Sequence, residues 1–217
     1  MKRICLLIFI ILAPLLCAAQ QIMYANLDAL VEGRGDTVTI LKVEKRAKGQ
    51  LFLTGGADYR IEAEGNRGLS RYLRRRCYAV QVDTQLFVNC RKMRYKRFRL
   101  GGWYAPAFRV GKNVYYSAQP VGQVAASTAT PPNAVRLGGD VGSALAASGL
   151  VHARVYYELD TASGKSYFVG KERMAELLAA YPDLQEKLMQ ETSESAGVIG
   201  KYLYLLRERE DAKSNLK

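Results

Sequence analysis

The sequence has little of what most enzyme active sites are built from. It contains one histidine, His152, and four cysteines, two of which, Cys5 and Cys17, lie in the first nineteen residues. A structural zinc site takes about four nitrogen or sulfur ligands, and a nucleophilic hydrolase needs a base beside its nucleophile. The pairs Gly55-Gly56 and Gly101-Gly102 carry neither the P-loop nor the dinucleotide pattern. We therefore expect no catalytic site, no metal and no cofactor.

One enzymatic alternative stays open, because two pairs of carboxylates fall on single strand faces. Glu62 and Glu64 alternate along one predicted strand, and Glu158 and Asp160 along another. Paired carboxylates can hydrolyse glycosidic bonds, but same-strand pairs are also common on solvated faces. A glycan-acting enzyme is thus the alternative and not the first interpretation.

The sequence also lacks an apolar run of the roughly twenty residues that a membrane-spanning helix needs. Its most apolar stretch, residues 4–16, follows two basic residues and precedes small ones, which is the order of a cleavable export signal over residues 1–19 with Gln20 as the first mature residue. We expect an exported protein, periplasmic or secreted, with no transmembrane helix in the mature chain. Lipid attachment at Cys17 is disfavoured because the preceding Leu16 is large.

Residues 20–121 are predicted to be rich in β-strands. Short segments with β-branched or aromatic residues are separated by glycine-rich or polar turns, which is typical of antiparallel sheets. These segments are TVTILKV (37–43), QLFL (50–53), YRIEAE (59–64), CYAVQV (77–82), LFVNC (86–90) and NVYYSA (113–118). LSRYLRRR (69–76) between two of them is expected to be helical. Residues 122–150 follow, with a small, polar, proline-bearing loop and then a run of small residues.

Residues 151–217 are predicted to form one more hairpin and then helices. Apolar residues recur at helical spacing in two stripes, and Pro182 ends the first element. The stripes are Met174, Leu177, Leu178 and Tyr181, then Val198, Ile199, Tyr202, Leu205 and Leu206. The expected fold is α+β, with an antiparallel β-rich N-terminal and central part and two or three C-terminal helices packed on it, so that residues 20–217 form one domain. As a structural alternative, the protein docks on a partner through these helices, which predicts an exposed apolar stripe around Val198, Ile199 and Tyr202.

The two remaining cysteines are predicted to form a disulfide. CYAVQVDTQLFVNC alternates apolar and polar residues on both sides of Asp83-Thr84, so a turn there would place residues opposite each other when their numbers sum to 167. Cys77 and Cys90 satisfy that sum, and an exported protein meets oxidising conditions. Free buried thiols are the alternative. Asp-Thr is not a preferred two-residue turn, which leaves the register open to slippage.

The positive charge is concentrated in one part of the chain. Of 32 Lys and Arg against 20 Asp and Glu, eleven basic residues and the single acid Asp83 lie between Arg67 and Arg99, and the rest of the mature chain is balanced. Ten of these basic residues flank the hairpin and are the candidate anion-binding residues. They are Arg71, Arg74, Arg75, Arg76, Arg91, Lys92, Arg94, Lys96, Arg97 and Arg99.

Such a surface attracts polyanions, and salt weakens the attraction. Basic residues interleaved with aromatic ones also mark nucleic-acid binders, but an exported protein meets little nucleic acid. The expected partner is an anionic envelope glycolipid, an acidic polysaccharide or an acidic protein. In the alternative interpretation, these residues pair with acids elsewhere in the chain or form a solvated face.

Several segments resemble an uncharacterised family of exported proteins from Bacteroides-type gut bacteria. They are the signal ending Ala18-Ala19-Gln20, RRRCYAVQVDTQLFVNCRKMRY, GGDVGSALAASG, and VYYELD with the later ERMAELLAAYPDLQEK. The resemblance implies bacterial export. It implies no activity, and none of these segments is a catalytic motif, so no functional residue carries over. The first interpretation is therefore a non-enzymatic envelope or secreted protein with a basic hairpin.

Overall fold

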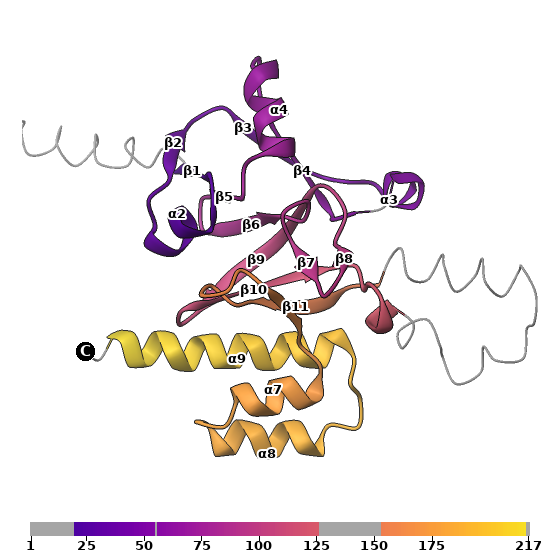
Figure 1. Cartoon of the computed structure of the whole chain (residues 1–217). Coiled ribbons are helices and arrows are strands. Elements are labelled where there is room, and N and C mark those ends of the chain that lie inside the picture. Colours follow the sequence, from indigo (N-terminus) through magenta and orange to yellow (C-terminus); the bar gives the residue numbers. More distant parts are fainter. Residues whose placement is uncertain (1–19, 55, 126–152, 216–217) are drawn as a thin grey trace, which may run out of the picture.

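A computed structural model, which describes residues 20–54, 56–125 and 153–215, has one large sheet on which the helices pack (Figure 1). It confirms the predicted α+β class, with β-rich N-terminal and central parts and C-terminal helices. The strands are β1 (Gln21–Tyr24), β2 (Asp36–Val38), β3 (Leu41–Lys45), β4 (Tyr59–Ala63), β5 (Ala79–Val82), β6 (Gln85–Asn89), β7 (Arg94–Tyr95), β8 (Phe98–Arg99), β9 (Tyr104–Val110), β10 (Asn113–Ala118), β11 (Val155–Leu159) and β12 (Ser166–Phe168). The helices are α2 (Leu27–Glu32), α3 (Lys48–Thr54), α4 (Arg67–Arg75), α7 (Lys171–Leu177), α8 (Pro182–Gln190) and α9 (Ala196–Asn215).

The sheet is antiparallel except at one pair of strands. Its order is β2-β1-β5-β6-β9-β10-β11-β12-β7-β8, and β3 and β4 join it where β4 pairs with β9. The exception is the parallel pairing of β12 with β7, in which Ser166 lies beside Tyr95. This pairing brings the short β7–β8 hairpin next to the β11–β12 hairpin, although about seventy residues separate them in sequence.

Strand alternation divides the core into clusters on the two faces of the sheet. On one face, Val88 and Tyr116 join the central cluster. On the other face, Phe87 packs in the cluster beneath α4, and Tyr115 packs in the cluster beneath the C-terminal helices. Helices α4, α7, α8 and α9 therefore cover the face opposite the central cluster, with α4 towards one end and α7, α8 and α9 towards the other (Figure 1). Helix α2 packs instead in the central cluster through Leu30.

The C-terminal helices cover the sheet with their apolar stripes. Met174 on α7, Leu188 on α8 and Leu203 on α9 are fully buried in one cluster. Ile199 and Tyr202 are 2% and 1% exposed. The predicted exposed stripe around Val198, Ile199 and Tyr202 is therefore wrong, because these side chains face the sheet. Among the helices of the described ranges, none combines the length and apolar character that crossing a bilayer requires.

One predicted strand is instead a helix. QLFL lies within α3, where Leu51 is buried and Leu53 is 81% exposed. In a strand these two side chains would share a face, so a strand would leave an apolar face half in water. Before its final threonine the segment contains no β-branched residue, and Phe52 alone favours an extended backbone.

The hairpin register is as predicted, but the disulfide is not present. β5 pairs with β6 so that Ala79 lies opposite Val88 and every pair sums to 167. Cys77 and Cys90 are nevertheless free thiols. The strand begins only at Ala79, so the alternation does not extend to Cys77, whose thiol packs on the α4 side of the sheet. Cys90 packs with Val88 in the central cluster on the opposite face, which keeps the two sulfur atoms apart.

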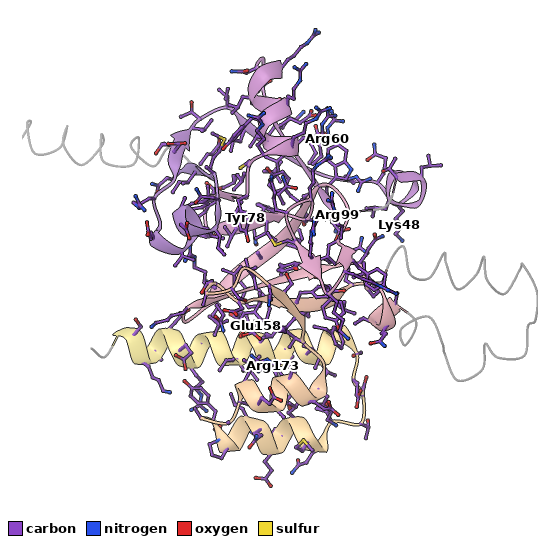
Figure 2. The ribbon with its side chains drawn as sticks, viewed as in Figure 1. Lys48, Arg60, Tyr78, Arg99, Glu158 and Arg173 are labelled. Atoms are coloured by element: carbon purple, nitrogen blue, oxygen red, sulfur yellow. The ribbon has the colours of Figure 1, made fainter. Side chains whose placement is uncertain are left out.

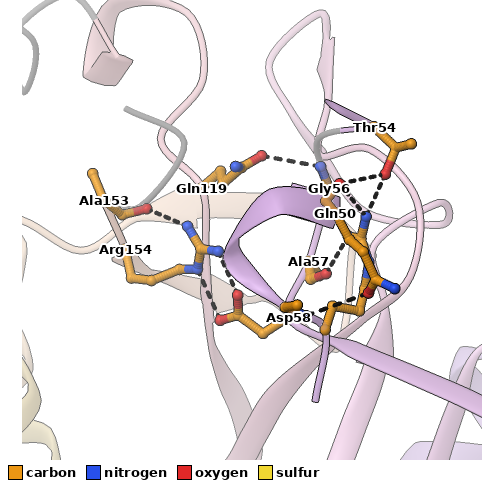
Figure 3. A network of polar contacts seen from close by, with 10 residues as sticks. Gln50, Thr54, Gly56, Ala57, Asp58, Gln119, Ala153 and Arg154 are labelled. Atoms are coloured by element: carbon orange, nitrogen blue, oxygen red, sulfur yellow. Dashed lines mark hydrogen bonds and ion pairs between the residues drawn. The ribbon is translucent and has the colours of Figure 1, made fainter. Parts of the chain in front are cut away.

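A polar network ties the loop after α3 to the ends of β10 and β11 (Figure 3). The buried Arg46 donates to the carbonyl of Ala57 at 2.7 Å, and its guanidinium lies 5.1 Å from the ring centre of Trp103. Arg154, just before β11, donates from Nε to Asp58 at 2.8 Å. The Gly56 amide donates to the side chain of Gln119 at 3.1 Å. The bonds of Gln119 and Arg154 hold the chain on the two sides of residues 126–152. Those residues, which include most of the predicted loop and small-residue segment, lie outside the described residues, as do residues 1–19.

Candidate anion-binding cleft

The ten candidate anion-binding residues are all exposed, and none of them forms a salt bridge with another described residue. The ion pairs within the described ranges use other cations, such as Arg60 with Glu62 and Arg209 with Asp183. Residues 126–152 contain a single acid, Asp140. Neutralisation by acids elsewhere in the chain therefore does not explain the positive charge.

The structure places five of the ten residues in two separate hollows. Leu73 anchors α4 in the cluster that contains Phe87, whereas Met93, next to β7, packs with Val88 on the opposite face. Arg71 and Arg74 border a groove beside α4, with a volume of ≈430 Å³. Lys92, Arg94 and Lys96 line a larger cleft of ≈1050 Å³. Neither hollow is lined by members of both groups, so the hairpin does not present its ten basic residues as one patch.

The larger hollow, hereafter the cleft, lies where β7, the β11–β12 turn and α7 meet. Its cations are Lys92, Arg94, Lys96, Lys165 and Arg173, its acids are Glu158, Asp160 and Glu176, and its aromatic residues are Tyr95, Tyr167 and Phe168. The parallel pairing of β12 with β7 creates this juxtaposition, because it places Lys165 and Tyr167 beside the basic segment.

Alternating burial directs the basic side chains of this segment outward. Met93 is 1% exposed, and Tyr95 packs against Tyr157 with 5.7 Å between ring centres. Arg94 therefore points to the other side. Lys96 follows the strand, in the turn between β7 and β8, where it donates to the side chain of Gln123 at 3.1 Å. Arg94 also lies directly opposite Arg99 in the β7–β8 pair. Like charges directly opposite each other destabilise a sheet, so this charge pattern opposes folding of the hairpin on its own.

Glu158 and Arg173, both labelled in Figure 2, line the cleft and form an ion pair of 2.8 Å, and we call this buried pair the base of the cleft. Glu158 is 1% exposed and accepts hydrogen bonds from Arg173 Nε at 2.9 Å, Asn113 Nδ2 at 2.7 Å and the Tyr115 hydroxyl at 3.2 Å. Arg173 also donates to Glu176 at 2.7 Å, and these bonds to carboxylates raise its pKa. Burial, together with the nearby Glu158 charge, raises the pKa of Tyr115. The base of the cleft is thus a saturated hydrogen-bonded unit that fixes the start of α7.

The β11–β12 turn supplies the third wall. Asp160 accepts hydrogen bonds from the Ser163 hydroxyl at 2.6 Å and the Ala162 amide at 2.9 Å, and these bonds lower its pKa. The charge of Lys165 acts in the same direction. Tyr167 on β12 is 45% exposed, which leaves one large apolar surface open at the cleft. Cations, hydrogen-bond acceptors and an aromatic side chain therefore line the same hollow.

The carboxylates of the cleft are engaged by hydrogen-bond donors of the chain itself. A glycosidase acid needs a raised pKa. Among the described carboxyl groups whose pKa is shifted, each is lowered, as at Asp160 and Glu191. Glu158 is already bonded by three donors, and Glu62 of the other predicted pair is bonded to Arg60 at 2.6 Å. Within the described ranges, no group of three or more His, Cys, Asp or Glu side chains could hold a metal, and His152 lies outside those ranges.

The sequence predicted three of the five cations of the cleft. Lys165 and Arg173 could not be found from it, because each stands alone among unrelated residues and comes to the cleft through the β7–β12 pairing and the docking of α7. Glu158 was considered as a member of a carboxylate pair, yet its partner in the structure is Arg173. The predicted residues Arg91, Arg97 and Arg99 are exposed nearby but do not line the cleft.

Comparison with known proteins gives one match. A family model described as a family of unknown function (DUF6563) matches residues 22–210. No curated protein and no solved structure matches the chain.

Proposed function

Since the chain belongs to the DUF6563 family, whose function is unknown, we propose from its own geometry that it is an exported, non-enzymatic protein that binds an acidic glycan in the cleft. The observation that carries this proposal is the combination of four cations without a salt bridge among the described residues, Lys92, Arg94, Lys96 and Lys165, with an exposed tyrosine in one hollow. Carboxylate or sulfate groups of the glycan would lie against the cations.

An acidic glycan fits the cleft better than the other anionic partners. Sugar rings have apolar faces that pack on an aromatic ring such as Tyr167, and their hydroxyl groups donate to acceptors such as Asp160 and Glu176. A dense polyanion would be repelled by these two carboxylates. A folded acidic protein would need a broad interface of more than about 1,000 Å² and not a hollow. The cleft volume of ≈1050 Å³ suits a short segment of an oligosaccharide.

Export remains part of the proposal and is supported by residues 1–19, which have the order of a cleavable signal, and by the resemblance to exported proteins of Bacteroides-type gut bacteria. A disulfide between Cys77 and Cys90 would have been a further reason to expect an oxidising compartment, but both cysteines are free thiols. Mass spectrometry of the secreted or periplasmic protein tests the signal. We expect an N-terminus at Gln20, and an acylated Cys17 would contradict simple cleavage.

Calorimetric titration of the chain beginning at Gln20 with a uronic-acid oligosaccharide tests the binding. We expect binding that weakens with salt, no binding of a neutral oligosaccharide of equal length, and loss of binding in a cleft variant with Lys92→Gln, Arg94→Gln and Lys165→Gln. The matched control, here called the α4 variant, carries Arg71→Gln, Arg74→Gln and Arg75→Gln and loses the same charge outside the cleft. An equal loss in both variants would show binding by net charge alone and would overturn the proposal.

The second candidate function is a glycan-acting enzyme that uses Glu158 and Asp160, because both carboxylates line the cleft. The same oligosaccharide, incubated with the protein and assayed for new reducing ends, separates the two functions. We expect none, since Glu158 is held by Arg173 and the pKa of Asp160 is lowered. Release of reducing ends that is abolished by Glu158→Gln would establish the enzyme instead.

A further inference from the structure

α4 gathers four arginines on its exposed side. At 3.6 residues per turn, Arg67, Arg71, Arg74 and Arg75 fall within an arc of about 100° around the helix axis. All four are exposed and none forms a salt bridge with a described residue. We call these four residues the α4 arginines. Neighbours three or four positions apart have Cβ atoms about 5–6 Å apart, so the guanidinium groups form a dense positive surface.

This arrangement opposes the stability of the helix that carries it. The first turn of α4 contains Arg67 and no acid, although the helix dipole favours negative charge at that end. Arg67 with Arg71, and Arg71 with Arg75, are like charges at i,i+4, which destabilise a helix. The acids of β3 and β4 are engaged with their own cations, Glu44 with Lys42 at 2.8 Å and Glu62 with Arg60 at 2.6 Å. Glu64, which follows β4, forms no salt bridge with any of the α4 arginines. A ligand outside the chain would offset this repulsion.

The sheet holds α4 rigidly in spite of its charge. Ser70 exchanges hydrogen bonds with the backbone of Ala63 at 2.9 and 3.1 Å. The Leu73 carbonyl, near the end of the helix, accepts from Asn89 Nδ2 at 3.0 Å and from the Tyr104 hydroxyl at 2.8 Å. Leu73 itself is fully buried. The apolar side of α4 is therefore committed to the core and cannot insert into a bilayer, so contact with any surface through α4 is electrostatic.

We infer that the α4 arginines form a second anion-binding surface that adsorbs to a lipid surface bearing phosphate headgroups. This inference goes beyond the glycan cleft, which it does not require. Arginine matches phosphate with two parallel hydrogen bonds. The groove of ≈430 Å³ beside α4 is bordered by Arg67, Arg71, Arg74, Ser70 and Glu62, whose charge is paired with Arg60, so the three arginines outnumber its one carboxylate. It suits one headgroup and has no aromatic lining for a sugar ring. Figure 1 shows α4 at the end of the molecule away from α7, α8 and α9, where a planar surface can reach it.

Vesicle cosedimentation tests the inference with the chain beginning at Gln20. We expect adsorption to vesicles that contain an anionic phospholipid, none to purely zwitterionic vesicles, and weakening with salt. The α4 variant should lower the partition coefficient roughly 100-fold, the size expected for three basic residues near an anionic bilayer. The variant with Arg71→Lys, Arg74→Lys and Arg75→Lys keeps the charge and should retain most of the adsorption. Circular dichroism checks that each variant is folded.

The cleft variant is the matched control, because it removes three positive charges from a different surface. It should lose glycan binding and keep vesicle adsorption, so that failure of either proposal is visible separately. The inference is overturned if both variants lose adsorption equally, if the α4 variant adsorbs like the wild type, or if zwitterionic vesicles bind as well as anionic ones. Displacement from vesicles by inorganic phosphate alone would also overturn it, since a multivalent surface contact should withstand a single free anion.

Discussion

Replacing Arg173 by methionine is expected to destabilise the protein by about 2 kcal/mol. The change removes the cation of an ion pair whose carboxylate, Glu158, is 1% exposed. Leaving such a charge unpaired costs about 3–5 kcal/mol when both partners are buried. The cost is reduced here because the guanidinium is 40% exposed, and because Asn113 at 2.7 Å and Tyr115 at 3.2 Å still donate to the carboxylate.

Urea unfolding of a double-mutant cycle measures this pair directly. Glu158→Gln keeps the shape and the bonds to Asn113 and Tyr115 and should cost about 1 kcal/mol, and the double variant should be less destabilised than the sum of the two single variants by about 1–2 kcal/mol. Arg209→Met is the control, since its pair with Asp183 is half-exposed, at 52% and 49%, and should be worth under about 1 kcal/mol. If Arg173→Met matched that control, or if the cycle were additive, the pair would not fix the base of the cleft.

The remaining predictions concern packing, titration and redox state. Gly200→Ala should destabilise by about 1 kcal/mol, because its Cβ would lie 2.7 Å from the Tyr156 hydroxyl and overpacking exceeds the gain in helix propensity. Gly197→Ala, with 3.7 Å to its nearest neighbour, should be neutral or stabilising in the same urea assay, and equal effects would contradict this account. Burial raises the pKa of the Cys77 thiol to about 11 and that of Cys90 to about 12. The stability that the two protonated thiols contribute is therefore complete below about pH 9 and is lost as the pH rises towards their pKa values in the folded protein. Cys90→Ala should thus flatten the fall of the unfolding free energy at alkaline pH. An unchanged slope would show that Cys90 does not titrate in this way. In the chain beginning at Gln20, a thiol reagent used without reductant should label both cysteines after denaturation and neither before it. If neither cysteine is labelled in the denatured chain, the two form a disulfide after all.

Local patterns of the sequence predicted the local structure well. The alternation on both sides of Asp83 fixed the hairpin register, because a slip of one residue would have turned every side chain to the other face. The spacing of Met174, Leu178 and Tyr181 likewise predicted the face with which the first of the C-terminal helices covers the sheet. The sequence did not predict α3, because an apolar run as short as Leu51–Leu53 does not distinguish a strand from a helix. In the structure Leu51 is buried and Leu53 is exposed, as a helix allows and a strand with one buried face does not.

Features that depend on distant segments could not be predicted. The disulfide prediction was wrong because it continued the strand alternation to Cys77, two residues before β5 begins. Cys77 lies in the connection from α4, where its side chain faces the other side of the sheet. The cleft depends on the parallel β7–β12 contact, which rests on the single register pair of Ser166 and Tyr95 and leaves no periodic signal. Composition located the positive charge, but only the positions of the elements show that it forms two surfaces.

The cleft segment and the α4 arginines both place like charges where they oppose folding. This argues against the interpretation that the basic residues form only a solvated surface without a ligand. Arg94 faces Arg99 across β7 and β8, and Arg67 occupies the first turn of α4. Two unit charges about 5 Å apart in water repel by about 0.8 kcal/mol, a cost that a charge placed elsewhere on the surface would avoid. A bound anion attracts the cations directly and also reduces the repulsion between them. The binding free energy therefore includes the repulsion energy that destabilises the free protein. Dissolved salt screens the same charges and also weakens ligand binding. Salt should therefore raise the unfolding free energy of the free protein and lower its affinity for anions. Charge that serves only solubility would show the first effect without the second.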